Sequence, residues 1–267
     1  MKYDDFFRNH PVFMASMFKN YFLKDDLGGR GPESILTYYS QRGRLLNVRQ
    51  GLYAVVPRGM CQNTFMPDPF LVAAKMTSDA VLSHHAALEF HGCAYSVWQH
   101  ITYSAKKPPA SMKFQQCTFK GTRFKEKLVN KNKEYFDVLV RDRLGMDVRV
   151  TSLERTFVDV LDRPDLSGSW EEIWRSLETI EYFDLDCVID YVNLLENATT
   201  AAKVGFFLEQ HRELLMVEES HLRVLRALCP RQPRYLDRVK RKSVHLVKFW
   251  NLIVPMEVYE RAWGEVL

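Results

Sequence analysis

The residues best suited to recognition chemistry lie between residues 32 and 57, in the segment PESILTYYSQRGRLLNVRQGLYAVVP. Ser34, Thr37 and Gln41 recur near i, i+3 and i+7, so a helix would bring these hydrogen-bonding side chains to one face. Three arginines follow closely, at positions 42, 44 and 49. Hydroxyl and amide groups hydrogen-bond to base edges, whereas guanidinium groups neutralise phosphates and release counterions. The combination favours DNA as the ligand.

A helix followed by a hairpin would hold these side chains. Pro32 suits the first helical position because its missing N–H is not needed there, and Gly43 can end the helix in a left-handed conformation. Two β-prone runs, 45–48 and 52–56, flank the turn Arg49-Gln50-Gly51. A polar helix followed by a basic hairpin is the layout of a winged helix-turn-helix, with the helix in the major groove and the wing along the backbone. The alternative is a helix–hairpin unit that only packs a core.

The residues before this segment predict its support. Phe13, Met17 and Tyr21 recur at i, i+4 and i+8, which predicts an amphipathic helix over residues 12–23. Residues 25–31, DDLGGRG, predict a turn. They are not a phosphate-binding loop, because no GxxxxGK[ST] pattern follows and no strand precedes them.

Charge is distributed unevenly, although the formal net charge of the 267 residues is only +4. Residues 1–60 hold nine Lys and Arg against five Asp and Glu, and residues 100–150 hold twelve against five. Residues 151–200 reverse the balance, with three against twelve. The first two regions suit a polyanion, which the third would repel. The basic loops between residues 106 and 133 include four further cationic side chains: Lys120, Arg123, Lys125 and Lys127. They either make a second set of phosphate contacts or protect the exposed edge of a strand from pairing with another chain.

Histidines in the segment SHHAALEFHG raise the question of a metal site. Ser83 is a suitable N-cap for a helix here, and the i, i+7 spacing brings His84 and His91 to one side of it. No acidic or cysteine ligand occurs at a supporting spacing, so histidines that pack at helix ends or between domains are the alternative. We expect no metal and no cofactor.

A nuclease site is the corresponding question for the carboxylates near residue 140. Asp137, Asp142 and Asp147 are spaced along predicted strands, but no carboxylate-x-Lys strand follows a suitable Asp. The paired-carboxylate and lysine machinery of metal-dependent hydrolysis is therefore incomplete. No nucleophile–base arrangement occurs elsewhere, and we expect no catalytic residue.

The pattern of elements after residue 60 indicates a mixed domain. Short β-prone runs at 101–104, 113–119, 135–140 and 146–150 predict a small sheet. Capping signals begin helices near 151 and 169, and further helices are predicted over 185–195, 200–211 and 219–228. We therefore expect an α+β fold with two domains. A winged helix-turn-helix would span residues 1–60, and an α/β domain with a small sheet and a helical C-terminal half would span 61–267.

Cysteine usage and hydropathy bear on the compartment. The five cysteines are an odd number, widely spread and without a CxxC pair, which indicates reduced thiols. Charged residues interrupt any apolar run at the N-terminus, so no signal peptide is expected. No apolar stretch approaches the roughly 20 residues that span a bilayer. We expect a soluble, cytoplasmic protein without a membrane partner.

Several segments together resemble one family. In chain order they are RQGLYAVVP (49–57), SHHAALEFHG (83–92), VTSLERTFVDVLDRP (150–164), KVGFFLEQH (203–211) and FWNLIVP (249–255). Their order and spacing resemble AbiEi, the antitoxin of bacterial abortive-infection (type IV) toxin–antitoxin systems. The chain departs from that pattern in its glycine-rich 25–31 turn and in a modestly charged first helix.

The resemblance implies a transcriptional autorepressor that binds inverted repeats in its own promoter. It also implies a C-terminal domain that counteracts a nucleotidyltransferase-like toxin without a stable complex. By position, it gives DNA-contacting candidates on the helix and on the wing: Ser34, Thr37, Tyr38, Gln41, Arg42, Arg44, Arg49 and Gln50. Gln41 is the candidate for a base contact, because its amide can pair bidentately with adenine, and the arginines would hold phosphates.

Two other interpretations stay open. One is a ligand-responsive repressor that senses a small molecule through aromatic residues of the C-terminal domain, namely Trp170, Trp174, Phe206 and Phe207. The other is a metal-dependent nuclease acting on DNA or RNA. A neighbouring gene for a nucleotidyltransferase would favour the antitoxin over both.

Overall fold

The computed structural model describes residues 3–22, 31–237 and 243–263 and has an α+β fold. Its contacts divide the chain into two compact units. Unit 1 comprises Met1–Leu82, Gln99–Arg123 and Val140–Val150. Unit 2 comprises Ser83–Trp98, Phe124–Leu139 and Thr151–Leu267. This division differs from the predicted boundary after residue 60, which stays a prediction.

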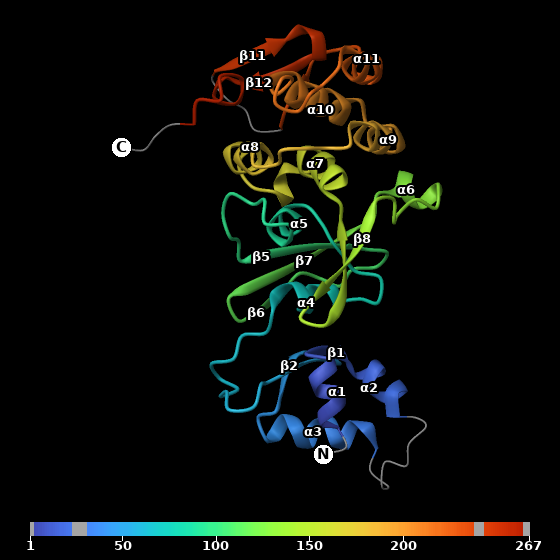
Figure 1. The fold of residues 1–267 in the computed structure, drawn as a ribbon, viewed down its shortest axis with the longest axis vertical. Helices are drawn as coiled ribbons and strands as arrows, with labels where there is room; N and C mark the ends of the chain where they lie inside the picture. Colours follow the sequence, from blue (N-terminus) through green and yellow to red (C-terminus); the bar gives the residue numbers. More distant parts are fainter. Residues whose placement is uncertain (1–2, 23–30, 238–242, 264–267) are drawn as a thin grey trace. The chain divides into compact units, whose positions relative to one another are not determined.

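The N-terminal part of unit 1 is a three-helix, three-stranded arrangement, drawn in blue in Figure 1. Its strands form a sheet of order β1-β3-β2, antiparallel throughout. In chain order its elements are α1 (Asp4–Asn9), β1 (Val12–Met14), α2 (Ala15–Phe22), α3 (Pro32–Gln41), β2 (Leu45–Arg49) and β3 (Leu52–Val55). The predicted turn at 25–31 lies outside the described residues except for Gly31.

The predicted helix over residues 12–23 is wrong in its first turn. Val12 and Phe13 belong to β1, where they pair with Ala54 and Tyr53 of β3. Both side chains are fully buried. β-branched and aromatic residues suit a half-buried strand, and pairing with β3 outweighs the helical periodicity that begins with Phe13. The helix α2 begins only at Ala15.

The helix and hairpin predicted from residues 32–57 are confirmed. Pro32 is the first residue of α3, and Gly43 has a φ of +70°, the left-handed conformation expected after the helix. β2 and β3 pair around a tight turn in which Gly51 has a φ of +76°. A register shift between Asn47 and Arg49 marks a bulge in β2 next to that turn.

A six-stranded mixed sheet makes up most of the rest of unit 1, with order β6-β7-β5-β4-β9-β8. β5 and β7 are parallel, as are β4 and β9, whereas β4 and β5 are antiparallel. A short helix, α4, precedes this sheet in the chain, and the side chain of Asp68 caps its N-terminus by accepting a hydrogen bond from the N–H of Leu71. These elements are α4 (Pro69–Ala74), β4 (Val81–Leu82), β5 (His100–Ala105), β6 (Met112–Phe114), β7 (Cys117–Arg123), β8 (Val138–Arg143) and β9 (Met146–Thr151).

The single strand predicted over 113–119 is in fact a hairpin. β6 ends at Phe114, Gln115 turns the chain with a φ of +51°, and β7 begins at Cys117. The sequence carries no Gly or Pro at this turn, so the periodicity runs through it without a visible break.

Unit 2 is mainly helical, with one large core. Ser152, Ser169, Asp184 and Asn197 cap four successive helices with their side chains. The helices are α5 (His85–Phe90), α6 (Glu126–Asn130), α7 (Leu153–Asp162), α8 (Trp170–Glu178), α9 (Leu185–Leu195), α10 (Ala198–Gln210) and α11 (Glu219–Leu228), with a 3-10 turn η1 (Pro164–Leu166) after α7. Figure 1 shows α10 and α11 next to the C-terminal strands.

A small C-terminal sheet completes unit 2, with order β10-β12-β11. The predicted strand over 244–254 is interrupted by a 3-10 turn that buries Trp250 against α10. The elements are β10 (Arg234–Tyr235), β11 (Val244–Val247), η2 (Lys248–Trp250), β12 (Leu252–Pro255) and α12 (Met256–Tyr259). Within the described ranges, no helix has both the length and the apolarity that crossing a bilayer requires.

Candidate nucleic-acid interface

The helix α3 turns one polar face to solvent. The five residues predicted on it are all exposed: Ser34, Thr37, Tyr38, Gln41 and Arg42. Arg42 lies over the ring of Tyr38, with its guanidinium carbon 4.7 Å from the ring centroid. These side chains therefore form one continuous surface of hydrogen-bonding groups with a cation at its C-terminal end.

The opposite side of α3 fixes that surface in place. Ile35 and Leu36 are buried in a cluster built largely from aromatic rings of α1 and α2, among them Phe6, Phe7 and Phe18. The rings of Phe6 and Phe18 meet edge to face at 5.1 Å between centroids. Because this core anchors the inner face of α3, the helix cannot rotate about its own axis, and the same side chains stay on the solvent side.

The hairpin arginines make contacts within the protein. The guanidinium of Arg44 donates to the carbonyl of Val56, and Nη2 of Arg49 donates to the carbonyl of Met76 at 2.5 Å. Arg49 is also half-buried, whereas Gln50 at the tip is exposed. Arg42 and Gln50 are therefore the most accessible of the candidates around the hairpin. The phosphate role predicted for Arg44 and Arg49 stays a prediction.

The two units carry net charges of opposite sign. Unit 1 contains 18 Lys and Arg against 9 Asp and Glu, a net charge of +9. Unit 2 contains 19 against 24, a net charge of −5. Only unit 1 therefore has the electrostatic character that attracts a polyanion.

The structure sorts the predicted second basic group into two kinds. Lys120 and Arg123 of β7 are exposed in unit 1. In unit 2, Lys125 forms an ion pair with Asp162, and Lys127 forms one with Glu196 at 2.6 Å. Hydrogen bonds from Lys127 and Lys131 lower the pKa of Glu196 to about 2. The charges of Lys125 and Lys127 are thus compensated within unit 2.

The histidines of the 83–92 segment occupy three different environments. His91 donates from Nε2 to the carbonyl of Thr151 at 2.8 Å. His85 is buried against the ring of Trp98, 4.1 Å between centroids, and its Nε2 lies 3.0 Å from Oε1 of Glu172. His84 rather than Ser83 is the N-cap residue of α5.

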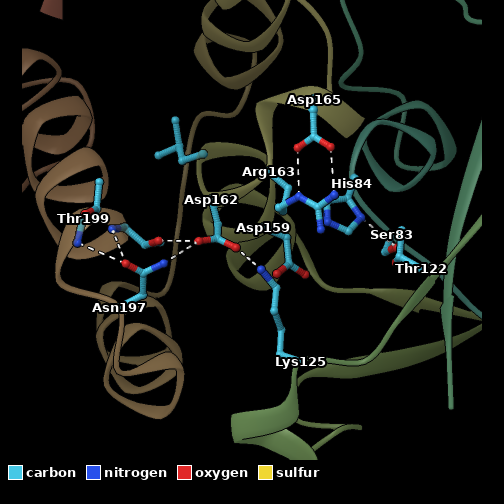
Figure 2. A network of polar contacts seen from close by, with 12 residues as sticks. Ser83, His84, Thr122, Lys125, Asp159, Asp162, Arg163, Asp165, Asn197 and Thr199 are labelled. Carbon is cyan, nitrogen blue, oxygen red and sulfur yellow. Dashed lines mark hydrogen bonds and ion pairs between the residues drawn. The ribbon is translucent and has the colours of Figure 1, made fainter. Parts of the chain in front are cut away.

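His84 lies beside a network of ion pairs in unit 2 (Figure 2). Lys125 contacts Asp162, which also accepts from Nδ2 of Asn197 at 3.0 Å, and Arg163 holds Asp165 with two hydrogen bonds of 2.8 Å. His84 is 3% exposed, and its Nε2 has no hydrogen-bond partner among the described residues. Burial lowers the pKa of His84 to about 4, so the imidazole is neutral at pH 7. Nothing in the sequence pattern distinguishes this histidine from its neighbour.

In the part of the chain that the structure describes, no group of three His, Cys, Asp or Glu side chains is placed to hold an ion. Arg155 and Asp159 form an ion pair within α7, 3.5 Å from Nε to Oδ2, and both side chains are buried. Arg155 also donates hydrogen bonds to the carbonyls of Glu134 and Phe136, so its side chain links α7 to the segment that precedes β8.

The aromatic residues suggested as a small-molecule sensor are part of the core of unit 2. Trp174 and Phe207 are fully buried, and Phe206 and Trp170 nearly so. Indole Nε1 of Trp174 donates to Gln210 at 3.0 Å, and that of Trp170 donates to Asp237 at 2.6 Å. Trp170 also borders an open cleft in unit 2.

Comparisons with known proteins give a fold and no family. No protein-family model matches the chain, and no curated protein matches it. Among solved structures, the chain is similar to the crystal structure of the RV2827C protein from Mycobacterium tuberculosis, with 15% sequence identity and a TM-score of 0.60. The match covers 98% of this chain and 93% of that one. At this identity the similarity shows a shared fold only.

Proposed function

We propose that the protein binds duplex DNA through α3 and the β2–β3 hairpin, and that it acts as a transcriptional autorepressor and antitoxin of a type IV toxin–antitoxin system. The observation that carries the DNA-binding proposal is the exposed polar face of α3, formed by Ser34, Thr37, Tyr38, Gln41 and Arg42. Helices that read the major groove present such side chains to base edges.

Two further features support this proposal. The order α1-β1-α2-α3-β2-β3, with β1 completing the sheet, is the order expected of a winged helix-turn-helix, in which α3 would be the recognition helix. The net charge of +9 on unit 1 would attract the phosphate backbone and speed association. Gln41 would read a base, and Arg42 and Gln50 would contact phosphates or sugars.

DNA binding is tested by gel shifts with a fragment of the protein's own promoter and with random DNA, at several fixed salt concentrations. Gln41→Ala should reduce the preference for the promoter by about 1–3 kcal/mol, because a bidentate base contact would be lost. Arg42→Ala should instead weaken binding to both DNAs and lower the slope of log K against log salt by about one.

Arg175→Ala is the matched control, since Arg175 lies on α8 in the negatively charged unit 2 and pairs with Glu171. Its DNA affinity should equal that of the unchanged protein. If Gln41→Ala and Arg42→Ala also leave affinity and salt dependence unchanged, α3 is not the recognition helix.

The antitoxin part of the proposal rests on the sequence resemblance and on the separation of charge between the units. Cells that express the neighbouring toxin from an independent promoter should be rescued by the full chain and equally by its Arg42→Ala variant, because neutralisation would not need DNA. Loss of rescue in that variant alone would mean that the protein protects cells only by repression.

A further inference from the structure

Unit 1 contains a pocket lined by residues of α2, of the end of α4 and of β9. Its volume is about 490 Å3, within the range of small-molecule sites. Ser16, Met17 and Asn20 of α2 form one wall. Lys75, Thr77 and Arg149 contribute from the end of α4, the turn before β4 and the strand β9. The pocket is thus lined by hydroxyl, amide and cationic groups, by the carboxylate of Asp147 and by two methionines, Met14 and Met17.

Among the residues that the structure describes, no acidic side chain lies within ion-pair distance of the ammonium of Lys75. The side chain is partly buried, and no hydrogen bond or salt bridge from its ammonium occurs among the described residues. Burial and the neighbouring charge of Arg149 lower its pKa, which Asp147 only partly offsets. A desolvated cation beside a second cation is unfavourable, and an approaching anion would stabilise the ammonium of Lys75.

A second polar group in the pocket also lacks a partner. Oγ1 of Thr77 is buried without a hydrogen bond among the described residues. Arg149 is held in place because its Nη1 donates to the carbonyl of Ser78 at 2.9 Å. Hydroxyl and guanidinium donors beside an ammonium are the groups that bind oxyanions in proteins.

We infer that this pocket binds a small metabolite bearing an oxyanion, either phosphoryl or carboxylate, with the anion on Lys75 and Arg149 and the organic part against Met14 and Met17. Thr77 and Asn20 supply further hydrogen bonds to it. This site is separate from the α3 surface and does not require that the protein bind DNA.

Thermal unfolding of the full chain, without DNA, tests the inference with two probes. Inorganic phosphate and citrate are titrated separately at constant ionic strength, so that general screening does not change. At least one of them should raise the melting temperature in a saturable manner, and which one does so distinguishes a phosphoryl from a carboxylate ligand. No stabilisation by either probe would overturn the inference.

Three variants locate the binding. Lys75→Met keeps the apolar stem and should weaken the apparent affinity about tenfold, because a charged hydrogen bond is lost. Asp147→Asn removes a carboxylate that repels the bound anion, so this variant should have a higher apparent affinity. Lys113→Met removes an exposed charge of β6, away from the pocket lining, and should leave the affinity unchanged. Equal affinities in all three variants and the unchanged protein would show binding elsewhere.

Discussion

His84 has a backbone conformation that residues with a Cβ rarely adopt, with a φ of 56° and a ψ of −136°. The same residue is buried, and its Nε2 lacks a hydrogen bond among the described residues. Both features cost free energy, of the order of 1–3 kcal/mol each. The core of unit 2 must therefore supply enough packing to hold this turn in place.

The pKa of His84 makes this cost measurable. In the folded protein burial lowers the pKa from 6.5 to about 4, so only the unfolded chain takes up the proton as the pH falls below 6.5. The free energy of unfolding should drop by about 3 kcal/mol between pH 6.5 and pH 4 from this group alone. His84→Asn, which tolerates a positive φ, should reduce the slope in that window when unfolding by urea is followed at each pH.

In the His84→Asn variant, the free energy of unfolding should still depend on pH in this window to a smaller extent. The reason is that burial also lowers the pKa of His85. Above pH 7 the two proteins should show no difference in pH dependence from this group, which provides the internal control. An identical slope between pH 6.5 and pH 4 in the variant would contradict the burial of a neutral His84.

At the residue level, helical periodicity was sufficient to predict which side chains of α3 reach solvent. Thr37 and Gln41 are exposed and Ile35 is buried, as their spacing predicts. Periodicity could not predict the contacts of Arg44 and Arg49. Their acceptors are main-chain carbonyls of Val56 and Met76, and every residue has a carbonyl that gives no sequence signal. The pocket around Lys75 was missed for a similar reason, since it joins residues from distant segments.

At the level of elements, the helices with capping side chains were predicted best. Ser169 caps α8 as expected, Ser152 caps α7 one residue after the predicted position 151, and the predicted range of α11, 219–228, is confirmed. The errors occurred where pairing with another strand decides the structure. Periodicity predicts a helix where β1 lies and a single strand where the β6–β7 hairpin lies, because strand partners are set by the fold as a whole.

The packing of α10 against η2 depends on one glycine. A Cβ at Gly205 would lie 2.0 Å from Cζ3 of Trp250, which is fully buried and donates from Nε1 to Glu209 at 2.6 Å. Alanine favours a helix by about 1 kcal/mol over glycine, but overpacking costs about 1–3 kcal/mol and the indole cannot move without losing its hydrogen bond. Gly205→Ala should therefore lower the free energy of unfolding, measured with urea.

A double-variant cycle identifies the cause. Trp250→Phe removes the ring atoms that meet the new methyl group, so the double variant should lose less stability than the sum of the two single variants. Strict additivity would show that the glycine is needed for another reason.

At the level of the whole molecule, the two units differ in net charge, and the N-terminal core of unit 1 is smaller than the main core of unit 2. The N-terminal core of unit 1 draws its buried residues from a short stretch between Phe6 and Val55. The main core of unit 2 extends from Leu88 to Val258 and joins most of its helices. A small core buries a smaller fraction of its chain and is less stable on its own. The part of the protein that carries α3 therefore has less packing to resist unfolding.

All five tryptophans belong to unit 2, and none to unit 1: Trp98, Trp170, Trp174, Trp250 and Trp263. Fluorescence excited at the red edge of tyrosine absorption thus reports on unit 2 alone, whereas far-ultraviolet circular dichroism reports on both units. During a urea titration the dichroism should begin to change before the tryptophan emission does, because the N-terminal core opens first. Coincident curves would instead mean that the two units unfold as one cooperative system, in which loss of the α3 surface could not precede loss of the rest.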